Sequence, residues 1–266
     1  MKKSVVNLFT VGIVSSLLFT GFGTVAAQTT SNSIIQSVKS SGVLNVGFEG
    51  TYPPFNYMNN KYQFARFDVD ISNAIAHQLG VKTAFVPGLW ATLIGGLKAN
   101  KFEIICAEMA VTPARKQQVD FTNPYEISGA VILTRKNTND IHNLAALKGK
   151  RVGVVGGTLF QKVADSVKGA EVHLYTTTPT MEQDLVDGRI DAFIDDKSSE
   201  EYVIHHDKLP IKIASGLVDK YDIAMAVQKG HPHFLAAVNK ALATIKKNGT
   251  YNKIYKKWFG ALPNGN

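Results

Sequence analysis

The sequence predicts an α/β fold arranged as two lobes. Strand-like and helix-like segments alternate along the chain, and the alternation restarts near residue 147. Two extended apolar runs, residues 129–136 and 222–229, flank the second series and are candidates for paired hinge strands. Alternation of this kind is typical of parallel sheets covered by helices. A chain of 266 residues is long enough for two modest cores.

The first series begins with the strand-like segment VLNVGFEG and continues with DVDISNAIAHQLG, which has helical spacing. Asp68 can cap that helix, and Gly80 can end it. Two further strands and a short helix are predicted, at residues 81–87, 102–111 and 90–100.

The second series repeats this alternation. Its predicted strands and helices are residues 147–157, 158–169, 171–178, 179–188, 189–196 and 197–206. A lysine-rich tail, residues 233–260, is predicted to be helical and could pack on either lobe.

The N-terminus has the pattern of an export signal. Lys2 and Lys3 precede an apolar run at residues 8–19, and small residues at 25–27 fit a cleavage site. The run is short for a membrane span, although a retained anchor is the alternative. We expect a signal peptide over residues 1–27. No cysteine follows it, so the sequence predicts a periplasmic protein without a lipid anchor.

The formal net charge is +8, and the basic residues are scattered along the chain. Scattered lysines indicate a solvated surface, and we expect no nucleic-acid binding. Cys106 is the only cysteine, so no internal disulfide can form, and we expect a buried structural thiol.

The stretch MAVTPARKQQVDF contains the most informative candidate for a binding residue. Thr112 is a good helix N-cap, and Pro113 suits the first helical position. Arg115 then lies in the first turn, where a cation meets the positive end of the helix dipole. An anionic ligand would explain it, because a guanidinium can hold a carboxylate with two hydrogen bonds. Pairing with Asp120 is the alternative.

Other candidates follow predicted strands, where ligands of parallel sheets bind. They are Glu49, Tyr52 and Phe55 in EGTYPPF, Trp90 at a helix start, Gly156-Gly157-Thr158, and Asp195 and Asp196. Each also has a structural alternative: a core aromatic ring, a tight turn or a helix cap. The histidines at 205, 206, 231 and 233 lack carboxylates or cysteines at metal-binding spacing. Together these residues suggest a free amino acid held between two lobes.

The chain resembles the polar amino-acid-binding proteins of ABC importers, solute-binding family 3. The resemblance covers residues 42–260 and rests on GVLNVGFEGTYPPF, FDVDISNAIAHQLG, MAVTPARKQQVDFTNPY, LKGKRVGVVGGT, DGRIDAFIDD and KKWFG. It implies a periplasmic "Venus flytrap" with residues 28–133 and 226–266 in lobe 1 and 134–225 in lobe 2. It also implies a monomer without cofactor or metal that delivers its amino acid to an inner-membrane permease.

The resemblance also implies roles for individual residues. Arg115 matches the residue that binds the ligand α-carboxylate, with Thr158 closing on it from the other lobe. Thr112, which begins the same stretch, is also expected to bind the ligand. Asp196, which ends the pattern D-A-x-x-x-D, matches the acid that takes the α-ammonium group. Tyr52 and Trp90 match aromatic walls, and Glu49 stands where some relatives place an acid that meets the ligand side chain. Both Gln183, in PTMEQDL, and the segment EGTYPPF are similar to the cystine-binding members, so Gln183 is expected to bind the ligand.

Three residues depart from the family pattern. Glu108 and Ala110 stand where relatives often carry small, amide or hydroxyl residues; Ala110 can still offer its backbone N–H, and Glu108 would favour a cationic side chain. Arg66 replaces a common glycine, at a position expected to be peripheral. The ligand is therefore expected to be cystine or a basic amino acid.

Two other functions are weighed against transport. A receptor-coupled sensor would use the same lobes. A cyclohexadienyl-dehydratase-like enzyme would need Asn and Glu after Gly-Gly-Thr, but Leu159 and Phe160 stand there. Proton transfer requires a titratable group within reach of the substrate, so no enzyme is expected.

Overall fold

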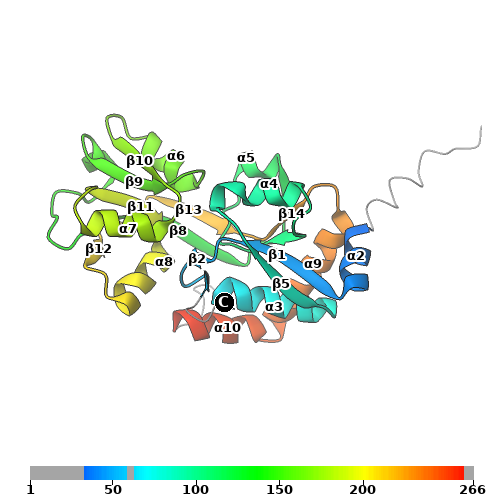
Figure 1. The fold of residues 1–266 in the computed structure, drawn as a ribbon. Coiled ribbons are helices and arrows are strands. Elements are labelled where there is room, and N and C mark those ends of the chain that lie inside the picture. The colour runs from blue at the N-terminus through cyan, green and yellow to red at the C-terminus, as the bar shows by residue number, and fades with distance from the viewer. Residues whose placement is uncertain (1–32, 59–62, 261–266) are drawn as a thin grey trace, which may run out of the picture.

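The computed structural model describes residues 33–58 and 63–260. The predicted signal peptide, residues 1–27, lies outside these ranges. No helix within them is long and apolar enough to cross a membrane. Two α/β lobes lie side by side and are joined by strands near the middle of the molecule (Figure 1).

The first lobe contains a five-stranded sheet with the order β5-β1-β6-β14-β7. Its strands are β1 (Val43–Phe48), β5 (Lys82–Pro87), β6 (Ile104–Ile105), β7 (Val119–Phe121) and β14 (Ala226–Gln228). Strand β1 runs parallel to β5 and β6, whereas β14 is antiparallel to β6 and β7. The strand predicted at residues 102–111 is much shorter than expected. Glu108 has φ of 50°, outside the extended region, so pairing stops before it and resumes only as an Ala110–Ile223 bridge.

Helices cover this sheet. They are α2 (Ser33–Ser41), α3 (Phe67–Leu79), η1 (Trp90–Thr92), α4 (Leu93–Lys98), α5 (Pro113–Lys116), α9 (Pro232–Lys247) and α10 (Thr250–Phe259). Ile71 and Ile75 of α3 share a fully buried cluster with Leu44 of β1 and Phe234 of α9. The lysine-rich tail therefore packs on the first lobe, and it is two helices because Gly249, with φ of 80°, interrupts it.

The start of α3 differs from the prediction. Its N-cap position is Arg66, which makes no capping hydrogen bond through its side chain. Asp68 is instead buried in the first turn and accepts hydrogen bonds from Asn56 Nδ2 at 2.9 Å and from Tyr125 Oη at 2.8 Å. Burial raises the pKa of Asp68 to about 6, although these donors oppose the shift. Asp68 thus ties α3 to the crossing region rather than capping it.

The second lobe has a sheet of order β10-β9-β11-β8-β12, with β13 also paired to β8. Its strands are β8 (Glu126–Arg135), β9 (Arg151–Val155), β10 (Glu171–Tyr175), β11 (Ala192–Asp196), β12 (Ile211–Ile213) and β13 (Asp219–Ile223). Strands β9, β10 and β11 are parallel, and β8 is antiparallel to β11, β12 and β13. Its helices are η2 (Leu144–Leu147), α6 (Leu159–Asp165), α7 (Thr178–Val186), α8 (Lys197–Tyr202) and η3 (Val203–Asp207).

Two segments cross between the lobes. One runs from β7 to β8, and the other runs from β13 to β14. Beside the crossing, β8 and β13 form an antiparallel pair that extends from Glu126↔Ile223 to Ala130↔Asp219. This pairing overlaps only the start of each predicted hinge run, because most of the first run lies within the second sheet. The predicted lobe boundaries remain predictions, and we propose that the lobes meet at residues 122–125 and 224–225, where the chain changes sheets.

A third, small sheet lies at the cleft side of the first lobe. It has the order β2-β3-β4. Its strands are β2 (Thr51–Tyr52), β3 (Asn56–Met58) and β4 (Phe64–Ala65). Strand β2 contacts α7 of the second lobe, so this sheet forms part of the seam between the lobes.

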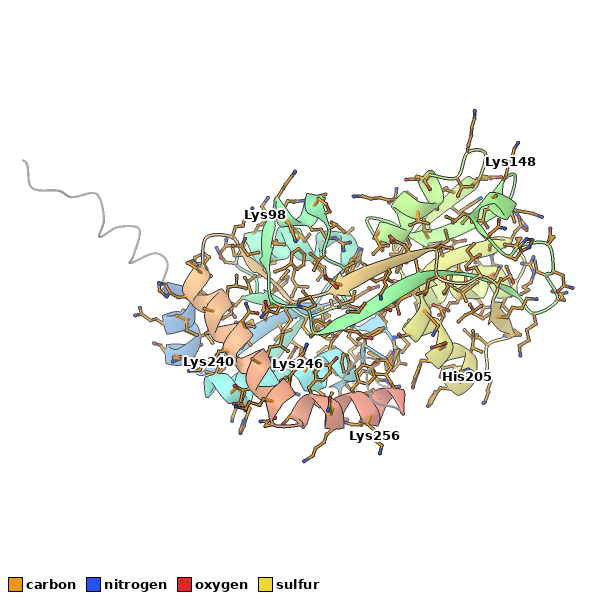
Figure 2. The ribbon with its side chains drawn as sticks, turned by 180° about the vertical axis from the view of Figure 1, so that it is seen from behind. Lys98, Lys148, His205, Lys240, Lys246 and Lys256 are labelled. Atoms are coloured by element: carbon orange, nitrogen blue, oxygen red, sulfur yellow. The ribbon has the colours of Figure 1, made fainter. Side chains whose placement is uncertain are left out.

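The basic residues do not gather at one place. Figure 2 shows Lys98 on the first lobe, Lys148 on the second, and Lys240 and Lys256 on the two tail helices. All four are exposed. This distribution agrees with the scattered lysines of the sequence.

Candidate ligand-binding site between the lobes

A pocket lies between the lobes. Eight of the predicted site residues line it: Glu49, Tyr52, Trp90, Glu108, Ala110, Arg115, Thr158 and Asp196. They come from both lobes and from segments far apart in the sequence. The structure therefore brings most of the strand-end candidates together.

Arg115 is the cation of this pocket. Its helix α5 begins as predicted, with the Thr112 hydroxyl accepting a hydrogen bond from the Arg115 backbone N–H at 3.2 Å. Its guanidinium donates to the carbonyl oxygens of Ala110, at 2.8 Å, and of Gly157 in the other lobe, at 3.3 Å. The side chain also lies against the Trp90 ring, with 5.0 Å between the guanidinium carbon and the ring centroid.

No carboxylate within the described ranges forms an ion pair with Arg115. Asp120, the alternative partner, instead accepts a hydrogen bond from the Gly230 backbone N–H. Burial without a counter-ion lowers the pKa of Arg115 to about 10, so it stays charged at neutral pH. Helix α5 has only four residues, and its dipole contributes little. The guanidinium itself provides the positive charge of the pocket.

Thr158 faces Arg115 from the second lobe. It is the N-cap of α6, where its hydroxyl accepts from the Gln161 backbone N–H at 3.3 Å and donates to the Val155 carbonyl at 2.7 Å. Gly157 before it has φ of 78°, and a Cβ there would lie 3.9 Å from Trp90. A Cβ at that distance would make only an ordinary contact, so it is the left-handed backbone of the Gly-Gly-Thr turn that favours glycine at this contact between the lobes.

Asp195 and Asp196 end β11 on the opposite wall, and both are buried. Asp196 Oδ1 accepts from the backbone N–H groups of Ser198, at 2.7 Å, and Ser199, at 3.2 Å, as the N-cap of α8. Its Oδ2 accepts from Tyr221 Oη at 2.7 Å. The helix-cap interpretation is thus correct, and Asp196 lines the pocket as well.

Asp195 joins the lobes directly. It accepts from Tyr52 Oη at 2.6 Å and from Thr178 Oγ1 at 3.1 Å. Burial raises the pKa of Asp195 to about 7, with the nearby Asp196 adding to the shift. Tyr52 therefore contributes both an aromatic wall and a hydrogen bond across the cleft.

Two acids of the first lobe face the pocket with few partners. Glu49 accepts a hydrogen bond from Thr51 Oγ1 at 3.0 Å, and burial raises its pKa to about 7. Glu108 is 7% exposed, and neither of its carboxylate oxygens has a hydrogen-bond partner among the described residues. Burial, followed by repulsion from Glu126 and Asp196, raises the pKa of Glu108 well above its ordinary value. Without a cation nearby, burial therefore favours the neutral, protonated form of Glu108.

Two predicted residues lie elsewhere. Thr112 lines a groove beside the pocket, shared with Trp90 and Arg115, and acts through its cap on α5. Gln183 is exposed on α7 and donates to Asp187 Oδ1 at 2.8 Å. The buried face of α7 is formed by Thr178, Met181, Glu182 and Leu185, so Gln183 points away from the cleft, and the structure corrects the prediction that it lines the pocket.

Sequence reasoning missed several residues of the pocket. They include Phe160 and Tyr221, whose rings meet edge to face with 6.1 Å between centroids, and Thr178. Thr178 follows β10 and starts α7, so the strand-end rule could have found it. Tyr221 lies within β13, where only the pairing with β8 brings it to the cleft.

Two α/β lobes joined by two crossing segments, with a pocket between them that charged and aromatic side chains line, define a solute-binding protein. Residues 44–261 match the family of bacterial extracellular solute-binding proteins, family 3. The chain belongs to this family.

Individual relatives agree with this assignment. The L-cystine-binding protein TcyJ of Escherichia coli strain K12 is 33% identical over 86% of this chain and 86% of its own length. An ancestral arginine-binding protein bound to arginine has a similar structure, with a TM-score of 0.79 and 37% identity, over 82% of this chain and 99% of that chain. The ancestral amino acid-binding protein AncCDT-1, a precursor of cyclohexadienyl dehydratase, has a TM-score of 0.80 and 34% identity, over 85% of this chain and 99% of that chain.

Proposed function

We propose that this chain is the substrate-binding component of an amino-acid ABC importer and closes its lobes on a free amino acid. The observation that carries the proposal is Arg115, a buried guanidinium on the pocket wall without an acidic partner in the described ranges. A buried charge is stable only when it is paired, so the missing anion is supplied by the ligand.

The pocket suits both ends of a zwitterion. The α-carboxylate binds the Arg115 guanidinium, and Thr158 closes on it from the second lobe. The α-ammonium group binds Asp196, whose carboxylate is held in place by the start of α8 and by Tyr221. Because the two charged walls belong to different lobes, the ligand stabilises the closed arrangement of the protein.

The acids of the first lobe favour a basic side chain. Glu49 and Glu108 line the same pocket, and neither forms an ion pair with a basic residue within the described ranges. A guanidinium or ammonium side-chain group would ionise and satisfy them, whereas the far end of cystine is a zwitterion whose carboxylate they would repel although its ammonium group would be attracted. The cystine-binding relative supports cystine as the second candidate, but the exposed Gln183 gives that candidate no additional contact in the pocket.

Binding rather than catalysis is the proposed activity. Leu159 and Phe160 begin α6 and line the pocket where a dehydratase of this fold would need Asn and Glu. An apolar pair there supplies no proton donor or acceptor. Turnover of prephenate or arogenate by the purified protein would contradict this proposal.

The remaining parts of the proposal concern the export, the location and the partners of the protein. We infer that the chain is exported through a cleaved signal peptide, works in the periplasm as a monomer, and delivers its ligand to an inner-membrane permease. Capture of a chemoreceptor or sensor kinase, and no permease, in a pulldown would favour the sensor instead.

A ligand screen tests the proposal. The melting temperature of the protein is measured with each common amino acid and with cystine, because a ligand at a thousandfold excess over Kd stabilises by about 4 kcal/mol. We expect arginine, lysine or histidine to give the largest increase in melting temperature.

The matching variant is Arg115→Ala. It leaves the ligand carboxylate without a partner, so we expect at least about a 30-fold loss of affinity, or about 2 kcal/mol, for every amino acid that binds. Lys116→Ala, which changes an exposed cation on the same helix, is the control and should bind normally. Unchanged binding by Arg115→Ala would mean that the ligand lies elsewhere.

A further inference from the structure

A second arginine, Arg66, lies at the seam between the lobes and outside the pocket lining. Its guanidinium carbon is 5.2 Å from the ring centroid of Tyr202, 5.2 Å from that of Trp258 and 5.6 Å from that of Tyr57. Cation–π attraction operates at these distances. Three aromatic rings therefore surround one cation.

These rings belong to both lobes. Tyr57 is in β3 and Trp258 is in α10, which packs on α3, so both belong to the first lobe. Tyr202 ends α8, which packs on β8, β11 and β12 of the second lobe. Arg66 thus joins an anchored site of the first lobe to a helix that moves with the second.

The partners on either side are held in place independently of Arg66. Trp258 Nε1 donates to Asp70 Oδ2 at 2.8 Å, which fixes the indole against α3. Tyr202 stacks on His206 with 4.7 Å between centroids. Each lobe therefore presents its ring in a fixed position, and Arg66 fills the space between them.

The backbone at Arg66 gives a second, independent observation. Its φ of 108° and ψ of −173° lie in a region that glycine adopts easily and other residues rarely do. Strain of this kind persists where the surroundings enforce it, and it often accompanies function. Glycine would remove both the strain and the guanidinium, so a substitution to glycine tests the side chain without adding strain.

Arg66 lies beside other contacts that cross the same seam. Ser199 Oγ, in the same helix as Tyr202, donates to the Pro53 carbonyl at 2.6 Å. Tyr52, next to Pro53, donates to Asp195. These contacts involve other residues than the contact of Arg115 with the Gly157 carbonyl, which also joins the two lobes. The Arg66 cluster is thus placed to hold the closed lobes together without touching the ligand.

We propose that Arg66 is a positioning residue that clasps Tyr202 across the seam and stabilises the closed, ligand-retaining arrangement. The proposal rests on the proposed function, in which closure retains an amino acid. A contact that exists only when the lobes are closed raises affinity by favouring that state. It should act on the rate of ligand release, because release requires the lobes to open.

The test combines Arg66→Gly with Tyr202→Leu and measures amino-acid association, dissociation and the melting temperature of the ligand-free protein. We expect Arg66→Gly to release ligand about 3- to 10-fold faster, as a partly exposed cation–π contact predicts. Association should stay within about twofold. The melting temperature should not fall, because glycine relieves the strain at this φ.

Controls separate the clasp from ordinary packing. Tyr202→Leu should accelerate release in the wild-type background and have no further effect in Arg66→Gly. Arg66→Lys keeps a cation and should restore part of the retention. Lys208→Gly relieves another positive φ, 62°, at an exposed residue, and should leave release unchanged. An unchanged release rate in Arg66→Gly, or fully additive effects of the two substitutions, would overturn the proposal.

A measurement without ligand distinguishes this proposal from the proposed function. Spin labels at Lys148→Cys and Lys240→Cys, which Figure 2 shows on opposite lobes, report the distance between the lobes. Arg66→Gly should shift the ligand-free population to a different, open distance even if no amino acid binds. The same distribution in both proteins would contradict the clasp.

Discussion

The two walls of the pocket differ in how well their charged groups are satisfied. On the second lobe, Asp196 receives three hydrogen bonds, from Ser198, Ser199 and Tyr221. On the first lobe, Glu108 receives none within the described chain, and Arg115 has only two carbonyl partners. The second lobe is therefore organised before the ligand arrives, whereas the first lobe has charges that a ligand would complete. We infer that the ligand binds first to the first lobe, and that the second then closes on it.

The largest effect is expected at the satisfied wall, on the second lobe. Asp196→Asn keeps an oxygen for the α8 backbone N–H groups but removes the negative charge opposite the ligand ammonium. We expect affinity for all amino acids to fall at least about 30-fold, or about 2 kcal/mol, with little change in fold. Isothermal titration calorimetry measures this, and Asp219→Asn, an exposed acid in β13, is the control. Normal affinity would place the ammonium elsewhere.

A smaller and more selective effect is expected at the unsatisfied wall. Glu108→Gln replaces a buried acid by a neutral side chain of the same shape, so affinity for arginine or lysine should fall about tenfold, which corresponds to about 1.4 kcal/mol. Affinity for a neutral amino acid such as glutamine should change little. Glu171→Gln, exposed on the second lobe, serves as the control. Equal losses of affinity for cationic and neutral ligands would show that Glu108 does not discriminate between ligand side chains.

The smallest effect is a pH dependence. Burial raises the pKa of Glu49 to about 7 from 4.5, so its stabilising contribution to the ligand-free protein is complete below pH 4.5 and is lost as the pH rises through 7. A cationic ligand favours the ionised form. Affinity for arginine should therefore rise about threefold per pH unit between pH 6 and 8, with release of a proton.

Calorimetry in two buffers of different ionisation enthalpy measures this proton release. Glu49→Gln should reduce the number of protons released when arginine binds. The unchanged protein should release fewer protons with glutamine than with arginine. Release of equal size with arginine and glutamine would mean that neither acid of the first lobe responds to the ligand side chain.

Much of the site could be predicted because it lies at strand ends. The end of β11 carries Asp196, and the turn after β9 carries Thr158; a parallel sheet brings such positions to one edge whatever the details of packing. Arg115 was recognisable because Thr112 and Pro113 mark the start of its helix. These positions depend on local sequence and on fold class alone.

The remainder depends on tertiary structure. Tyr221 reaches the pocket only through the pairing of β13 with β8, and no local pattern specifies that register. The positive φ of Glu108 ended a strand that β-propensity alone would have extended. Gln183 was assigned by resemblance, but the buried face of α7 turns it to solvent. Arg66 was expected to be peripheral, and only the packing of α8 against the first lobe reveals its neighbours.

A crystal structure of the protein with a bound amino acid tests the central claim most directly. We expect the ligand α-carboxylate at about 3 Å from the Arg115 guanidinium nitrogens, with Thr158 on its other side. A guanidinium turned away from the cleft, or a carboxylate bound by other residues, would contradict it.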